Sequence, residues 1–323
     1  MQESIETLFQ TQFEEDIYKG LTDFPKHISS KYFYDARGDQ LFRDIMNMPE
    51  YYLTDCEYDI LEKYKGEISE LFSAGGPTFK LLELGAGDGK KTKILLKHLV
   101  ENRIVFKYQP IDISQNVLDQ LETSLKTELP GMAVETYQGT YFEALERISS
   151  KNGVKKVILF LGSNIGNLLH PQAISFLKSV QELMGKEDLF FVGFDQKKNP
   201  QAILDAYNDK TGITEAFNKN VLTRIKREMG ANFNLEAFLH WEVYNPETGT
   251  AKSYLVSKEQ QSVIIDKINL KVEFKPWETI HTEISQKYDD ATINWLAEKS
   301  GLQIETFFQD SHDRYRNYAF RKK

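Results

Sequence analysis

Short apolar runs alternate with longer amphipathic segments through the middle of the chain, from about residue 58 to residue 195. The apolar runs have the length of strands, and they cover residues 79–84, 104–111, 132–137, 156–161 and 189–194. The amphipathic segments predict helices over residues 90–100, 114–125 and 171–184, with Ser114 as an N-cap and Pro171 in a first turn. Strands that are apolar throughout and separated by helices predict a parallel sheet that is covered on both faces.

The flanking regions follow other patterns. Residues 201–229 predict a helix interrupted near Gly212, and strand-like runs follow at 238–244, 252–257, 262–265 and 270–274, with a hairpin turn at 245–249. A helix over 292–300, ended by Gly301, and strands over 302–309 and 315–321 would complete the sheet. Near the N-terminus, residues 41–46 have helical spacing and Pro49 stops them. The patterns together predict a doubly wound, Rossmann-like α/β sheet with a second α+β domain.

The composition excludes several classes of protein. The 323 residues carry a formal net charge of −8 and show no basic stripe, so we expect no nucleic-acid partner. The single cysteine, Cys56, allows neither an intrachain disulfide nor a cysteine zinc site, and we expect it to be buried and no metal to bind. The apolar runs are far shorter than the ~20 residues that span a bilayer, and the acidic N-terminus lacks an apolar signal core. We therefore expect a cytoplasmic monomer without a membrane partner.

The strongest chemical signal is the glycine-rich run over residues 82–89, where Gly85, Gly87 and Gly89 connect a predicted strand to a predicted helix. Glycine lets the backbone turn sharply and lets a ligand approach the main chain. Glu83 lies inside the strand end, and Asp112 ends the next strand, where an acid can accept both hydroxyls of a ribose. Nicotinamide dehydrogenases share this logic, but the spacing is not G-x-G-x-x-G. The arrangement favours S-adenosylmethionine as the cofactor.

Several ordered blocks make a more specific pattern over nearly the whole chain: residues 31–38, 41–42, 49–52, the glycine-rich turn, 161–167, 206–209, 217–220 and 280–285. In these blocks the sequence resembles the histidine-specific Nα-methyltransferases, which make trimethylated histidine on the way to ergothioneine. The resemblance implies a methyltransferase sheet over residues 58–197 and 286–323. It also implies a substrate-recognition domain over residues 1–57 and 198–285, with the substrate between the two.

The same resemblance assigns roles to individual residues. It implies that Asn167 and Tyr207 hold the carboxylate of the amino acid, that Tyr51 lies beside the same substrate, and that Glu283 and Ser285 contact the imidazole. A carboxylate that accepts an imidazole N–H would reject a phenyl ring, which leaves it unpaired. By the same resemblance Tyr34, Gly85, Lys91 and Asp112 would line the cofactor, and we expect Glu83 and Gly87 of the glycine-rich turn to join them. Tyr34 or Tyr51 would orient the reacting amine.

One block departs from the family. An acid commonly follows the glycine at the end of the third strand, where it can meet the adenine amine, but here the run is Gly139-Thr140-Tyr141. We expect Thr140 and Tyr141 to remain beside the cofactor, with Thr140 supplying an uncharged acceptor.

Two alternatives to histidine methylation stay open. The chain could methylate the nitrogen of another amino acid or of a tryptophan derivative, or it could be a regulatory module that binds the cofactor without turnover. A substrate screen separates the first of these, and blank methyl-transfer assays on all free amino acids would favour the second.

Overall fold

The computed structural model describes residues 9–149 and 153–323, and the chain divides into two compact units. Unit 1 comprises the described chain up to Tyr52 together with Lys198–Ser285, and unit 2 comprises Leu53–Lys197 and Gln286–Lys323. The first division lies before Leu53 rather than near residue 58, because the continuous helix α3 (Leu53–Ser73) belongs to unit 2.

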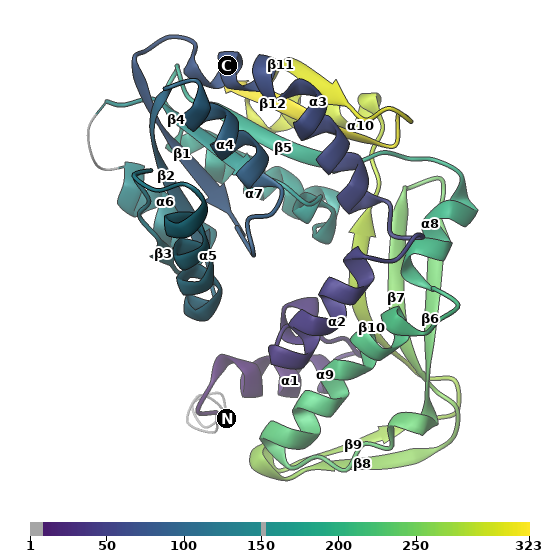
Figure 1. Ribbon diagram of the computed structural model, residues 1–323. Helices are drawn as coiled ribbons and strands as arrows, with labels where there is room; N and C mark the ends of the chain where they lie inside the picture. The colour runs from purple at the N-terminus through teal and green to yellow at the C-terminus, as the bar shows by residue number, and fades with distance from the viewer. Residues whose placement is uncertain (1–8, 150–152) are drawn as a thin grey trace. The chain divides into compact units, whose positions relative to one another are not determined.

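Unit 2 is built on a seven-stranded sheet in the order β11-β12-β5-β4-β1-β2-β3 (Figure 1). Strands β1 to β5 run parallel to one another, whereas β12 is antiparallel to both β5 and β11. The order reverses at β1, which pairs with β2 and with β4, so the predicted doubly wound sheet is confirmed. The strands are β1 (Thr78–Leu84), β2 (Val105–Asp112), β3 (Tyr137–Gln138), β4 (Lys156–Phe160), β5 (Leu189–Asp195), β11 (Leu302–Gln309) and β12 (Tyr315–Lys322).

Helices cover both faces of this sheet because successive strand residues point to opposite sides. On one face the Phe72 ring of α3 packs against Phe79 of β1 and Phe191 of β5. On the other face Leu82 and Leu84 of β1 belong to a core shared with α7 and α10, which pack on each other. The helices of this unit besides α3 are α4 (Thr92–Glu101), α5 (Gln115–Glu128), α6 (Tyr141–Ser149), α7 (His170–Leu183) and α10 (Asp290–Ser300), with the short 3₁₀ helix η2 (Asn164–Asn167).

The structure confirms the predicted N-cap of α5 and the predicted C-terminal end of α10, and it corrects one strand. Ser114 caps α5 by accepting from the amide of Val117, and Gly301 ends α10 in the left-handed conformation. The third strand was predicted over residues 132–137, but β3 covers only Tyr137–Gln138, with an isolated bridge between Tyr108 and Val134. This segment follows the turn at Gly131 and lies at the sheet edge, where a half-exposed strand has a partner on one side only.

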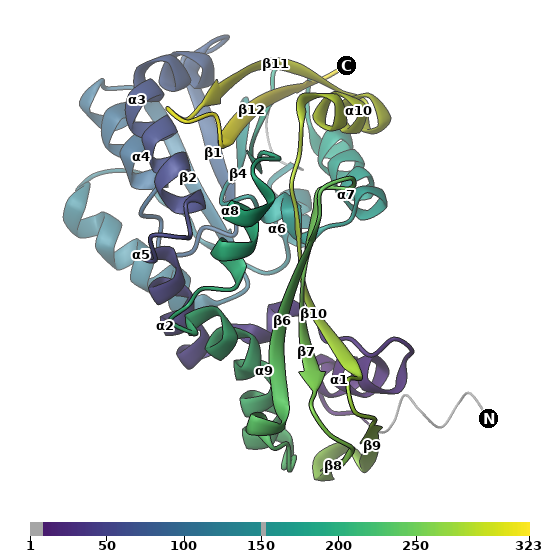
Figure 2. The same cartoon turned by 90° about the vertical axis from the view of Figure 1, so that its right-hand side faces the viewer.

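Unit 1 has the predicted α+β composition (Figure 2). Its three-stranded sheet has the order β10-β7-β6, and a two-stranded sheet pairs β8 with β9. The predicted turn closes the hairpin of β6 and β7, since the amide of Gly249 donates to the carbonyl of Asn245. The strands are β6 (Phe238–Asn245), β7 (Thr250–Ser257), β8 (Gln261–Ile265), β9 (Leu270–Phe274) and β10 (Thr279–Gln286), the last of which ends in unit 2.

The helices of unit 1 surround a separate apolar core. They are α1 (Gln12–Thr22), α2 (Ala36–Met46), α8 (Pro200–Tyr207) and α9 (Ile213–Met229), with the 3₁₀ helices η1 (Ser30–Phe33), η3 (Leu235–Ala237) and η4 (Asp266–Ile268). Buried side chains from α9, including Val221 and Ile225, pack in this core with Phe238 of β6 and Ile280 of β10. The helix predicted over residues 201–229 is thus two helices, divided where Gly212 adopts a left-handed conformation.

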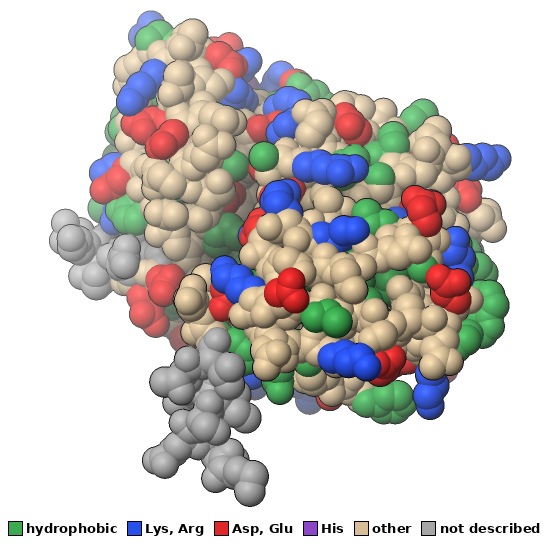
Figure 3. Space-filling view, turned by 90° about the horizontal axis from the view of Figure 1, so that it is seen from below, with side chains coloured by type: hydrophobic (Ala, Val, Ile, Leu, Met, Phe, Trp, Pro, Cys, Tyr) green, Lys and Arg blue, Asp and Glu red, His purple; other side chains and the backbone are tan. Residues whose placement is uncertain are grey.

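The described surface mixes charges of both signs. On the face drawn in Figure 3, Lys and Arg side chains are interspersed with Asp and Glu side chains. Within residues 9–149 and 153–323, no helix is both long and apolar enough to cross a membrane.

Candidate functional site

The glycine-rich turn connects β1 to α4 in unit 2. Gly85, Gly87 and Gly89 have φ values of 72°, 55° and 65°, a left-handed conformation that other residues adopt at a cost. A Cβ on Gly89 would lie 2.5 Å from Leu121, whereas a Cβ on Gly87 would meet no atom of the described chain within 4 Å. A side chain at position 89 would therefore displace the end of the Leu121 side chain, and the open space at Gly87 leaves its backbone accessible to a ligand.

Asp112, at the carboxyl end of β2, fixes this turn from the next strand. Its Oδ2 accepts the amide of Gly87 at 3.2 Å, and its Oδ1 accepts the amide of Ser114 at 3.0 Å. A carboxylate has about four acceptor positions, so these two bonds leave capacity for ligand hydroxyls. The turn and Asp112 together suit a nucleoside. The backbone at Gly87 is open to a ligand, and the oriented Asp112 carboxylate can accept ribose hydroxyls.

Glu83 supports the turn from inside the sheet. It is 3% exposed, and its carboxylate accepts the hydroxyl of Thr92 at 2.5 Å and the hydroxyl of Tyr108. Burial raises the pKa of Glu83 to about 7, although both hydroxyls act to lower it. The side chain ties β1 to the start of α4 and to β2, which is a structural contribution to the cofactor turn.

Lys91 directly precedes α4, and its ammonium contacts a carboxylate that sequence reasoning missed. The Lys91 Nζ lies 2.5 Å from Oε2 of Glu57, whose side chain is fully buried in α3. The signal for Glu57 was present in the sequence. It occupies the same helical stripe as Leu53, Ile60 and Leu61, where an apolar residue is expected.

Thr140 and Tyr141 lie at the start of α6. The amide and hydroxyl of Thr140 both donate to Oε2 of Glu143, at 3.0 and 2.8 Å, so this carboxylate satisfies a backbone donor at the start of the helix. The hydroxyl of Tyr141 lies 2.9 Å from the position of a Cβ on Gly85, so the structure brings Tyr141 to the glycine-rich turn. Burial, and next the charge of Asp112, raise the pKa of Tyr141 to about 12.

The loop from Gly162 to Asn167 follows β4 at the same carboxyl edge of the sheet. Gly162 and Ser163 both have positive φ, 73° and 55°, and Ser163 is a strained position for a residue with a Cβ. Three bonds from other elements hold the loop: Glu57 accepts the Gly162 amide at 2.8 Å, the Ser163 hydroxyl accepts an amide of β5 at 3.2 Å, and the Tyr288 hydroxyl donates to the Ile165 carbonyl at 3.0 Å. Asn167 ends the loop and is exposed.

The predicted substrate residues of unit 1 come together from separate segments. The hydroxyls of Tyr207 in α8 and Ser285 in β10 lie 2.7 Å apart. The Tyr51 ring meets the Tyr207 ring edge-on, with centroids 6.2 Å apart, and Phe42 links Tyr51 to Tyr34 by two further edge contacts. Tyr34, Tyr51, Tyr207 and Ser285 thus form one connected group in this unit.

Glu283 lies on β10 two positions before Ser285 and is half-buried. The backbone carbonyl of Glu283 accepts a hydrogen bond from Nε2 of His281 at 3.1 Å. A second carboxylate of this sheet, Glu242, is 8% exposed and accepts the hydroxyl of Ser253, its register partner on β7, at 2.6 Å. Ser253 therefore faces Glu242 in the interior, whereas the ring of Tyr254 lies 5.4 Å from His281.

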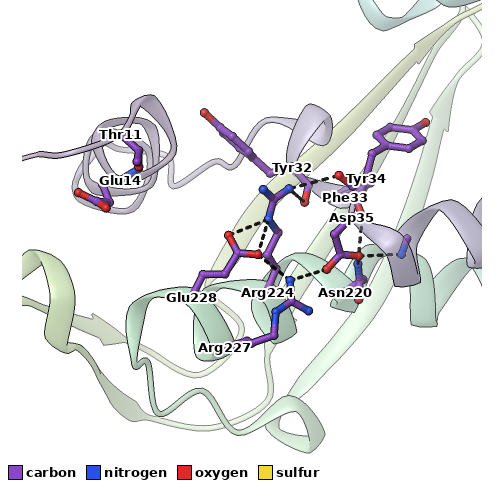
Figure 4. A network of polar contacts seen from close by, with 11 residues as sticks. Thr11, Glu14, Tyr32, Phe33, Tyr34, Asp35, Asn220, Arg224, Arg227 and Glu228 are labelled. Atoms are coloured by element: carbon purple, nitrogen blue, oxygen red, sulfur yellow. Dashed lines mark hydrogen bonds and ion pairs between the residues drawn. The ribbon is translucent and has the colours of Figure 1, made fainter. Parts of the chain in front are cut away.

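A polar network that sequence reasoning missed holds the backbone around Tyr34 (Figure 4). From α9, Nη1 of Arg224 donates to the carbonyls of Tyr32 and Tyr34, each at 3.3 Å. Asn220 of the same helix donates to the carbonyl of Phe33 at 3.0 Å and to Asp35 at 2.9 Å. The backbone of this segment is fixed, while the Tyr34 side chain stays 42% exposed.

Asp35 connects the same network to α2. It caps α2 by accepting the amide of Gly38 at 2.8 Å, and it forms an ion pair with Arg227 of α9 at 2.7 Å. Gly38 lies so close to the preceding turn that a Cβ there would be 1.8 Å from the Phe33 carbonyl oxygen. These contacts join the segment 31–38 to helix α9.

Known proteins are similar to this chain over nearly its whole length, including the residues described above. A family model described as "Histidine-specific methyltransferase, SAM-dependent" matches residues 13–322. A histidine N-alpha-methyltransferase of Mycolicibacterium smegmatis is 32% identical over 295 residues, which covers 91% of this chain and 90% of that protein. Ergothioneine biosynthesis protein 1 of Schizosaccharomyces pombe is 29% identical over 92% of this chain and 39% of its own length. An L-tryptophan methyltransferase of Psilocybe serbica is 27% identical over 93% of this chain.

Proposed function

Because the chain belongs to the family of histidine-specific, S-adenosylmethionine-dependent methyltransferases, we propose that it transfers methyl groups to the α-amino group of L-histidine, up to the trimethyl product. The observation that supports this substrate most directly is the hydroxyl pair of Tyr207 and Ser285, beside the ring of Tyr51. These three residues are among those that the family resemblance assigns to the substrate. The product would enter ergothioneine synthesis, the process named for the fungal relative.

The cofactor is S-adenosylmethionine, and the residues of the glycine-rich turn fit it. In this proposal Gly85, Gly87 and Asp112 hold the nucleoside, and Lys91 contacts the same molecule. Thr140 and Tyr141 would lie at the adenine end, and Tyr34 is the further residue that the family resemblance assigns to the cofactor. When bound, the cofactor supplies an electrophilic methyl group on a sulfonium, which needs no further activation.

The protein's own task is to orient a neutral amine. An α-amino group is mostly protonated near neutral pH, and its proton must leave before the nitrogen can attack. We assign the orientation of the amine to the hydroxyls of Tyr34 and Tyr51. The ring faces of tyrosine also favour the permanent positive charge of the trimethylated product. Correct alignment of reacting groups can supply several kcal/mol of catalysis, roughly 7–11 in the best cases.

Specificity follows from the groups at the two ends of the substrate. Asn167 and Tyr207 would hold the carboxylate, and Glu283 and Ser285 would hold the imidazole. A substrate without a ring N–H would give up its hydrogen bond to the Glu283 carboxylate, at a cost of about 1.5–3 kcal/mol. Histidine should therefore be preferred over tyrosine and over amino acids with apolar side chains.

The test is calorimetric titration of L-histidine, tryptophan and tyrosine into purified protein, followed by mass spectrometry after S-adenosylmethionine is added. Selective binding of histidine and mass gains in methyl steps would support the proposal. Turnover of another amine, with none of histidine, would refute the substrate. No turnover on any free amino acid would favour a regulatory module.

We also propose that the protein acts as a monomer in the cytoplasm. One cysteine in 323 residues and a net charge of −8 suit a reducing, aqueous compartment. Light scattering with size-exclusion chromatography measures the mass of the particle, and fractionation of the source cells locates it. A mass of two or more chains would refute the monomer.

A further inference from the structure

The buried carboxylate of Glu57 collects donors from distant parts of unit 2. Its Oε2 accepts the Lys91 ammonium at 2.5 Å and the Gly162 amide at 2.8 Å. Its Oε1 accepts the Tyr315 hydroxyl at 3.1 Å and the side-chain amide of Asn317 at 2.9 Å. The four donors therefore fix the orientation of both oxygens.

Packing alone does not explain a carboxylate at this position. Glu57 is 0% exposed and lies on the apolar stripe of α3, next to Cys56 and one turn before Ile60 and Leu61. Burying a carboxylate costs several kcal/mol before its partners compensate, and an apolar residue of similar volume often gives equal or greater stability. A charged residue retained at such a position is better explained by what its oxygens hold.

The two donors to Oε2, Lys91 and Gly162, both lie at the carboxyl edge of the sheet, where the glycine-rich turn and the Asn167 loop begin. Lys91 follows the glycine-rich turn, and its side chain is 22% exposed although its partner is buried. Gly162 begins the left-handed loop that leads to Asn167. One oxygen atom therefore connects a residue assigned to the cofactor with the loop assigned to the substrate carboxylate.

The two donors to Oε1, Tyr315 and Asn317, both belong to β12 and hold the Glu57 carboxylate from that strand. Tyr315 is fully buried, and burial, followed by the charge of Glu57, raises its pKa well above the usual range. Its hydroxyl is protonated at physiological pH and donates to Oε1. Asn317 is also fully buried in the same strand.

We propose that Glu57 is a positioning residue for the methyl transfer: it sets the Lys91 ammonium for cofactor binding and anchors the start of the Asn167 loop. This inference rests on the proposed function, because it takes the roles of Lys91 and Asn167 from there. Glu57 itself is buried and does not contact substrate.

The first test is Glu57→Gln, which keeps the shape of the side chain and removes its charge. The single amide oxygen can still accept from the Lys91 ammonium and the Gly162 amide, but it carries no charge to hold the ammonium. The new NH2 group meets the two donors that contact Oε1, the Tyr315 hydroxyl and the Asn317 side-chain amide. We expect S-adenosylhomocysteine to bind about tenfold more weakly to this variant by calorimetry. In turnover assays KM for S-adenosylmethionine should rise by a similar factor, with a smaller change in kcat.

A double-mutant cycle separates positioning from general support. Lys91→Met removes the ammonium, and the double variant Glu57→Gln/Lys91→Met should bind S-adenosylhomocysteine no more weakly than Lys91→Met alone. Losses that multiply in the double variant would overturn the proposal, because Glu57 would then act independently of Lys91.

Asp188→Asn is the matched control. Asp188 is 4% exposed, contacts the Lys156 ammonium at 3.1 Å and accepts two backbone amides, but it lies where β4 and β5 begin, at the opposite edge of the sheet. This control should lower the midpoint of thermal unfolding and leave the dissociation constant unchanged.

If Glu57→Gln does not fold, Tyr315→Phe tests the same point, because it removes one donor from Oε1 and should weaken cofactor binding two- to fivefold. If either folded variant binds S-adenosylhomocysteine as tightly as the wild type does, the inference about Glu57 is overturned. The cofactor assignment would stand in that case, because the wild-type protein still binds. Wild-type protein that does not bind S-adenosylhomocysteine would instead contradict the proposed function.

Discussion

The replacement Glu83→Gln should change how the stability of the protein depends on pH. The carboxylate of Glu83 is fully buried below the glycine-rich turn, where the Thr92 and Tyr108 hydroxyls contact it. Both hydroxyls can rotate to donate to, or accept from, an amide in the same place. The substitution therefore removes the titrating group while it preserves the contacts.

The magnitude follows from the pKa of Glu83, which burial raises from 4.5 to about 7. A raised pKa means that the folded state keeps the proton after the unfolded chain has lost it. The contribution of Glu83 to the free energy of unfolding is therefore complete below pH 4.5 and is lost as pH rises toward 7. At about 1.4 kcal/mol for each pH unit, the total loss is roughly 3 kcal/mol, and about 2.5 kcal/mol of it falls between pH 5 and pH 8.

The assay is urea denaturation of wild type and Glu83→Gln at pH 5, 6, 7 and 8, followed by circular dichroism. The free energy of unfolding of the wild type, measured relative to that of the variant, should fall by about 2.5 kcal/mol from pH 5 to pH 8. Glu182→Gln, on the exposed side of α7, is the control and should follow the wild type at each pH. Parallel curves for wild type and Glu83→Gln would refute the reasoning, because Glu83 would then titrate alike in the folded and unfolded states.

Three further predictions concern binding and packing. Gly38→Ala would place a Cβ 1.8 Å from the Phe33 carbonyl oxygen, so the free energy of unfolding should fall by about 1–3 kcal/mol in urea titrations; an unchanged value would contradict the close approach. Asp112→Asn should weaken S-adenosylhomocysteine binding about 10- to 100-fold by calorimetry, since bonds to a charged acceptor contribute about 1.5–3 kcal/mol, and an unaltered affinity would exclude Asp112 from the cofactor site. Tyr207→Phe should raise KM for histidine about tenfold and leave the affinity for S-adenosylhomocysteine unchanged. A loss of cofactor affinity in that variant would instead point to a general disturbance of unit 1.

Local sequence was sufficient where neighbouring residues decide the conformation. The sharp turn at Gly85 and Gly87, the capping of α5 by Ser114 and the end of α10 at Gly301 depend on a few adjacent positions, and each was predicted. The alternation of apolar strands and amphipathic helices likewise defined the parallel sheet, because covered strands must be apolar on both faces.

Local pattern was insufficient where a segment lies at an edge or depends on a distant partner. The third strand was predicted too long, because an apolar run does not reveal that its neighbour pairs with it over only two residues. The helix α3 was missed because a charged residue, Glu57, interrupts its apolar stripe. That charge makes sense only once Gly162 and Tyr315 have been brought to it.

The sequence by itself determined the sheet, the glycine-rich turn and, through resemblance, the family to which the chain belongs. Tertiary structure decided which side chains support the site. Glu57 accepts the Lys91 ammonium, and Asn220 and Arg224 donate to the backbone carbonyls of Phe33 and Tyr34. These partners are separated by 34 to 190 positions in the chain. Hydrogen bonds over such separations depend on how strands and helices are ordered in space, and no local periodicity encodes that order.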